Sequence, residues 1–93
     1  MIPLQNRGKR QGDQVVWLLF NHSIEFTEDE FTEIIYSIRE KGLFWYLNSE
    51  RPALKSRIST ILATELPEGI FETEVDTEFY LEQCLLGLND RVN

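Results

Sequence analysis

Residues 26–42, which read FTEDEFTEIIYSIREKG, organise the fold of this chain. Thr27 and Glu30 have the spacing of a capping box, in which each side chain accepts a hydrogen bond from the other residue's backbone amide. Phe26 and Phe31 flank this cap at positions that pack together as a hydrophobic staple. These signals predict a helix that begins directly after Thr27.

The same stretch has the apolar periodicity of a helix with one buried face. Phe31 is followed by Ile34, Ile35 and Ile38, so large apolar side chains recur at the i, i+3, i+4 and i+7 spacing. Gly42 comes after the last turn and can take the left-handed conformation that ends many helices. We therefore predict a helix that ends at Gly42 and packs its apolar face against another layer.

Four other segments have strand-like patterns. Residues 15–20, VVWLLF, combine β-branched and aromatic side chains in a run too short for an independent buried helix, which predicts an interior strand. Residues 23–26 and 70–75 alternate between apolar and polar side chains, as strands with one wet face do. Residues 43–47, LFWYL, are compatible with a strand or with a short helix, and we expect a strand.

Two further helices are expected downstream. Ser49 can cap a second helix in which Pro52 falls in the first turn, where a missing amide costs nothing. Asp76 can cap a third helix that extends to about Leu88.

The third helix has two apolar stripes, whereas a surface helix usually has one. Phe79 and Leu86 point almost opposite to the main stripe. The second stripe therefore either packs inside its own domain or meets another chain, which includes a second copy of this one. The main stripe consists of Leu81, Cys84, Leu85 and Leu88.

These elements predict an α+β fold in which three amphipathic helices pack on a small sheet of two or three strands. The expected strands of that sheet are residues 15–20, residues 70–75 and, as the third, residues 43–47. An all-α bundle is the alternative. Residues 1–12 are basic and poor in apolar side chains, so we expect a flexible N-terminal arm, and residues 13–93 are expected to form one small globular domain.

Neither the composition nor any motif indicates catalysis. The chain has one histidine, His22, and no nucleophile motif around it, while a single cysteine, Cys84, cannot form an internal disulfide. Clustered metal ligands and a glycine-rich phosphate loop are also absent from the sequence. We expect no enzyme, no metal and no cofactor. Because no apolar run approaches the roughly 20 residues of a membrane span, the expected compartment is the cytoplasm.

The net charge of −7 is concentrated in the last third of the chain. Residues 58–90 contain eight carboxylates and no Lys or Arg. Such a surface repels nucleic acid and membranes and speeds encounter with basic proteins. We therefore expect a non-catalytic protein-binding domain, an adaptor or an inhibitor of a basic partner. The candidate partner-binding residues are Glu65, Glu68, Glu72, Glu74, Asp76, Glu78, Glu82, Phe79 and Leu86.

A nucleic-acid-binding protein is one alternative, although the net charge disfavours it. Its phosphate contacts would come from the basic arm and the second helix. The cations concerned are Arg7, Lys9, Arg10, Arg51, Lys55 and Arg57.

A second alternative comes from a resemblance. Residues 22–31, HSIEFTEDEF, resemble the segment that enters the first helix of the colicin nuclease immunity proteins, which are small acidic inhibitors. The resemblance covers about a tenth of the chain and implies an immunity- or antitoxin-like inhibitor of a nuclease. It assigns no binding residues.

Overall fold

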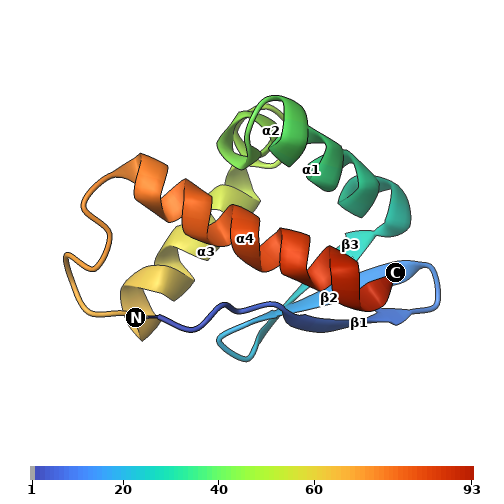
Figure 1. The fold of residues 1–93 in the computed structure, drawn as a ribbon, viewed down its shortest axis with the longest axis horizontal. Helices are drawn as coiled ribbons and strands as arrows, with labels where there is room; N and C mark the ends of the chain where they lie inside the picture. Colours follow the sequence, from blue (N-terminus) through green and yellow to red (C-terminus); the bar gives the residue numbers. More distant parts are fainter. Residues whose placement is uncertain (1) are drawn as a thin grey trace.

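The computed structural model describes residues 2–93, which form three strands followed by four helices (Figure 1). The strands make one antiparallel sheet in the order β1-β2-β3. The predicted α+β fold is confirmed, with four helices where three were expected. The elements are β1 (Arg7–Gln11), β2 (Gln14–Leu19), β3 (His22–Thr27), α1 (Glu28–Glu40), α2 (Leu43–Glu50), α3 (Pro52–Glu65) and α4 (Glu74–Val92).

The sheet is a meander of consecutive strands joined by two-residue turns. Gln11 is paired with Gln14 across the first turn, and Leu19 with His22 across the second. Phe20 and Asn21 form the second turn, and both have positive φ, which suits the right-handed twist of the flanking strands. The strands predicted at residues 15–20 and 23–26 are therefore confirmed as β2 and β3.

Strand β1 (Arg7–Gln11) corrects the expected flexible arm over residues 1–12, of which Met1 lies outside the described residues. This strand pairs along its whole length with β2, so the backbone groups on the side that faces β2 are paired in the sheet. The guanidinium of Arg10 also contacts the Glu28 carboxylate and donates to the Val92 carbonyl at 3.2 Å. Low apolar content suggested a mobile segment, but β1 is an edge strand that needs few buried side chains of its own.

The residues before β1 are held against α4. The Tyr80 hydroxyl donates to the Pro3 carbonyl at 2.7 Å, and the Gln5 amide donates to Cys84 Sγ at 3.2 Å. The indole of Trp17 donates to the Gln5 carbonyl at 2.6 Å. Burial raises the pKa of the Cys84 thiol, so Cys84 is a neutral core residue at ordinary pH.

The core lies between one face of the sheet and the helices. Val15, Trp17 and Leu19 alternate along β2 toward this core and are completely buried. Helix α4 packs on β1 and β2, α1 packs on β3, and α2 contacts α1, α3 and α4 (Figure 1). The main apolar stripe predicted for the third helix is buried in α4. None of the helices in residues 2–93 combines the length and the apolar character that a bilayer span requires.

Helix α1 has the predicted start. The Thr27 hydroxyl accepts from the Glu30 amide at 3.1 Å, and the Glu30 carboxylate accepts from the Thr27 amide at 2.9 Å. The rings of Phe26 and Phe31 are 6.0 Å apart between centroids, as the predicted staple requires. The helix ends beside Gly42, whose φ is 100°.

Two strand predictions were wrong. Residues 43–47 belong to helix α2, whose first amides are capped by carboxylates of α4. Residues 70–75 form the end of a loop and the first turn of α4, because Thr73 caps that helix by accepting from the Asp76 amide at 3.2 Å. Short apolar or alternating runs do not by themselves distinguish strands from helices.

Two helix starts also differ from the prediction. Ser49 lies inside α2, so the expected second helix begins at Pro52 after Arg51 instead. The third predicted helix starts earlier than Asp76 and extends beyond Leu88, as helix α4.

Candidate functional site

Two of the nine candidate residues, Glu78 and Glu82, have structural contacts at the start of helix α2. The Leu43 amide donates to Glu82 Oε2 at 2.8 Å, and the Phe44 amide donates to Glu78 Oε2 at 2.7 Å. Helix α2 has no side-chain cap of its own, because its N-cap residue is Gly42. The two carboxylates of α4 therefore cap α2 from another element, where the helix dipole favours negative charge.

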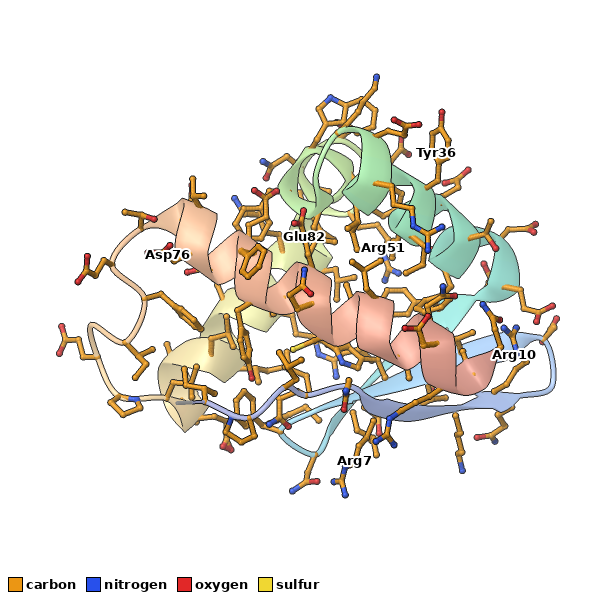
Figure 2. All side chains as sticks on the ribbon, viewed as in Figure 1. Arg7, Arg10, Tyr36, Arg51, Asp76 and Glu82 are labelled. Carbon is orange, nitrogen blue, oxygen red and sulfur yellow. The ribbon has the colours of Figure 1, made fainter. Side chains whose placement is uncertain are left out.

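The environment of Glu82 is only partly favourable to its charge. Burial raises the pKa of the Glu82 carboxyl, the hydrogen bond from Leu43 opposes this shift, and the charge of Glu78 adds to it. Figure 2 shows Glu82 on α4, on the side that faces α2. Both carboxylates are partly buried, which makes them poor candidates for first contact with a partner.

Three other candidates have partners inside the chain. Glu74 Oε1 lies 3.3 Å from Lys55 Nζ, and Glu65 Oε1 lies 4.0 Å from His22 Nε2. Leu86 is partly buried and packs against the core, so only part of the second stripe of α4 faces solvent.

The remaining candidates are exposed, and three of them meet in one hollow. Glu72, Asp76 and Phe79 line it together with Leu4 from the N-terminal segment and Ile70 from the loop before α4. The hollow has a volume of about 440 Å³. Figure 2 shows Asp76 at the end of α4 where this loop joins the helix. The fourth exposed candidate, Glu68, lines a second hollow, between α3 and the loop before α4. Ile70 lines both hollows.

Large apolar side chains are unusually exposed around this hollow. Phe79 is 62% exposed, and Val75, one helical turn earlier on the same face, is 71% exposed. Contiguous apolar surface with a polar rim marks binding sites in many proteins. We define the α4 patch as the six residues Leu4, Ile70, Glu72, Val75, Asp76 and Phe79.

Three members of the α4 patch, Leu4, Ile70 and Val75, were not predicted from the sequence. Val75 could have been found, since it lies four residues before Phe79 and i, i+4 positions share a helical face. Leu4 and Ile70 carry no such signal. They reach the patch only because the N-terminal segment docks on α4 and the preceding loop folds beside it.

Four of the six cations of the nucleic-acid alternative contact groups of the same chain: Arg10, Arg51, Lys55 and Arg57. Arg51 Nη1 lies 3.3 Å from Glu30 Oε2, and Arg57 donates to the Ser23 carbonyl at 2.8 Å. Arg7 and Arg10 come from β1, where Figure 2 shows them at different positions along the strand. Several of these positive charges are therefore already engaged by groups of the same chain.

His22 lies near one carboxylate. The carboxylate that pairs with His22 is Glu65, at the 4.0 Å given above, and both side chains are exposed. No group of three or more His, Cys, Asp or Glu side chains in residues 2–93 is arranged to hold a metal ion.

Comparisons of the chain with protein-family models, with curated proteins and with solved structures give no match.

Proposed function

We propose that this protein is a non-catalytic binding domain that uses the α4 patch to hold a basic, amphipathic segment of a protein partner, as an adaptor or an inhibitor. The observation that carries this proposal is that exposed apolar side chains line the same hollow as carboxylates that make no ion pair within residues 2–93. Phe79 and Ile70 supply the apolar part, and Glu72 and Asp76 supply the negative charge.

The charge of the patch supports a basic partner. Residues 66–82 contain six carboxylates and no Lys or Arg. Two of the six cap α2 and one pairs with Lys55, which leaves Glu68, Glu72 and Asp76 with no ion pair to any residue of the described chain. A lysine or arginine of a partner would meet these charges at the rim of the hollow and speed association.

The apolar part of the patch supports an amphipathic segment rather than a purely polar one. Phe79 and Val75 form a ridge on α4, and the hollow beside Phe79 is lined by Leu4 and Ile70. An apolar side chain of the partner can enter the hollow while its cations stay at the rim. Interfaces of this kind gain most of their affinity from a few buried anchors.

A second copy of the chain fits the patch less well. Two identical patches would bring Glu72 and Asp76 close to the same carboxylates of the other copy, and like charges at an interface are unfavourable. An immunity- or antitoxin-like inhibitor of a basic nuclease is compatible with the proposal, because such a nuclease is one kind of basic partner.

The test compares two charge reversals of equal size. Partners captured by the immobilised full chain are identified by mass and purified. The affinity of each partner is then measured for the parent protein, for Glu72→Lys/Asp76→Lys and for the control Glu25→Lys/Asp90→Lys. All four positions are exposed, so both variants should fold. We expect the patch variant to weaken binding at least about tenfold, with the control near the parent protein. Equal losses in both variants would refute the patch and indicate attraction by net charge alone.

A further inference from the structure

A second exposed aromatic surface lies between α1 and α2, away from the α4 patch. It is a groove of about 560 Å³ that includes the exposed rings of Tyr36 and Trp45, which are 65% and 48% exposed. Figure 2 shows Tyr36 projecting from α1 at the opposite side of the view from Asp76. The α1–α2 groove is lined by Thr32, Glu33, Tyr36, Ser37, Lys41, Trp45, Tyr46 and Glu50.

One cation already uses an aromatic face of this groove. Lys41 Nζ lies 4.3 Å from the centroid of the Trp45 ring. This distance is within the range of a cation–π contact, and at an exposed site such a contact is worth only about 0.5–1 kcal/mol. The Lys41 side chain is exposed, so a cation from outside can replace it at little cost.

The charges around the groove also favour a cation. Glu33 and Glu50 lie on its walls, and neither has an ion pair to another residue of the described chain. Burial of the Tyr46 side chain raises the pKa of its hydroxyl, and the charges of Glu30 and Glu33 raise it further. Arg51 lowers this pKa, by more than Glu50 raises it.

We propose that the α1–α2 groove binds an arginine side chain presented by a protein partner, with the guanidinium stacked on Trp45 and its N–H groups turned to Glu33 or Glu50. A guanidinium is planar, stacks on aromatic faces and forms forked hydrogen bonds to carboxylates. A lysine ammonium can match the charge but not this combination. This inference does not depend on the α4 patch, because the two surfaces share no residue.

The experiment titrates the 93-residue chain with acetyl-tetra-arginine amide, and with the tetra-lysine peptide in parallel, at low salt. Trp17 is completely buried, so a change in tryptophan emission reports on Trp45. Calorimetry supplies the affinity for the variants. We expect the arginine peptide to change the emission and to bind several-fold more tightly than the lysine peptide.

Matched variants separate the groove from the general acidity of the protein. Glu33→Gln/Glu50→Gln should weaken arginine-peptide binding about fivefold more than Glu25→Gln/Asp90→Asn, which makes the same change in charge elsewhere. The same peptide should bind Trp45→Leu about fivefold more weakly, and Phe79→Leu with unchanged affinity.

Lys41→Met provides a test with the opposite sign. Removal of the internal cation should tighten arginine-peptide binding, and by more than Lys9→Met, which changes the net charge equally on strand β1. The proposal is overturned if the lysine peptide binds as well as the arginine peptide. It is also overturned if the matched carboxylate pairs, or the two lysine variants, have equal effects.

Discussion

Two pairs of carboxylates near the start of α4 have the same charge and very different surroundings. Glu78 and Glu82 accept hydrogen bonds from the first amides of α2 and are partly buried. Glu72 and Asp76 are exposed beside Phe79 and make no ion pair within residues 2–93. The first pair holds two helices together, whereas the second is available to a partner.

The difference is set by what lies opposite each side chain. One full turn separates Glu78 from Glu82, so both face the N-terminus of α2, where the Leu43 and Phe44 amides have no acceptor within their own helix. Glu72 comes before the helix and Asp76 is in its first turn, and neither carboxylate has a hydrogen bond or ion pair to α2. A carboxylate-rich segment therefore predicts an acidic surface. Which of its carboxylates have no hydrogen-bond or ion-pair partner within the described chain depends on the element that packs against them.

The largest predicted effect is the loss of the cap on α2. Glu78→Ala/Glu82→Ala removes both acceptors from the Leu43 and Phe44 amides, and we expect the free energy of unfolding to fall by about 2–3 kcal/mol. Urea titration at neutral pH measures this change.

The control for the cap is Glu72→Ala, which should change the free energy of unfolding by less than about 0.5 kcal/mol, because Glu72 is exposed and makes no ion pair within residues 2–93. If the capping variant were as stable as the parent protein, Glu78 and Glu82 would have no structural role. The contrast between the two pairs would then disappear.

A smaller loss is expected for Gly42→Ala. Gly42 has φ 100° and ψ 151°, a conformation that is essentially restricted to glycine, and an added Cβ would lie 3.0 Å from Glu78 Oε2. We expect a loss of about 2 kcal/mol in thermal or urea unfolding.

Gly12→Ala is the control for this change, because Gly12 also has positive φ but an added Cβ would have no neighbour within 4 Å. It should cost about 1 kcal/mol. The Gly42→Ala effect should also be smaller in the Glu78→Ala background, where the close contact is absent. Simple additivity of the two changes would mean that Gly42 and Glu78 are not coupled.

The sequence predicted local structure well where several independent signals agreed. The start of α1 combined a capping box, a staple and helical periodicity, and all three are present in the structure. Residues 15–20 were rich in β-branched and aromatic side chains, and all of them except Phe20, which lies in the following turn, belong to the central strand β2.

The failures came from information that is not local. Residues 43–47 are helical partly because carboxylates that follow 34 and 39 positions later cap the amides of Phe44 and Leu43. Strand β1 is ordered because β2 pairs with it, and Leu4 belongs to the α4 patch because Tyr80 holds the segment that precedes β1. Sequence periodicity describes one element at a time. It therefore predicted Phe79 as a binding residue, but not Leu4 and Ile70, which line the hollow beside Phe79.

The pH dependence of stability should distinguish Glu82 from an exposed carboxylate. Burial raises its folded-state pKa above the ordinary value of 4.5, so the folded protein keeps this proton to a higher pH than the unfolded chain does. The stabilisation that comes from protonation of Glu82 is therefore greatest below about pH 4.5 and is lost as the pH rises through the raised pKa. The hydrogen bond that Glu82 accepts from the Leu43 amide is a separate contribution to stability.

Glu82→Gln removes this titration and keeps an oxygen acceptor for the Leu43 amide. Relative to the parent protein, the variant should gain stability as the pH rises from about 4 to about 7, by less than the Gly42→Ala loss. Urea titrations at several pH values measure the difference, with Glu72→Gln as the control. A constant difference across this range would contradict a raised pKa at Glu82.

The smallest effect on stability is predicted where the effect on binding is greatest. Phe79 is 62% exposed, so Phe79→Ser should change the free energy of unfolding by no more than about 0.5 kcal/mol. Capture of a basic partner should nevertheless fall at least about tenfold, because the apolar anchor of the α4 patch is lost. Binding and urea unfolding of the same preparation measure both quantities. A large loss of stability would show that Phe79 serves the fold, as Glu78 and Glu82 do, and unchanged binding would remove the patch from the proposed function.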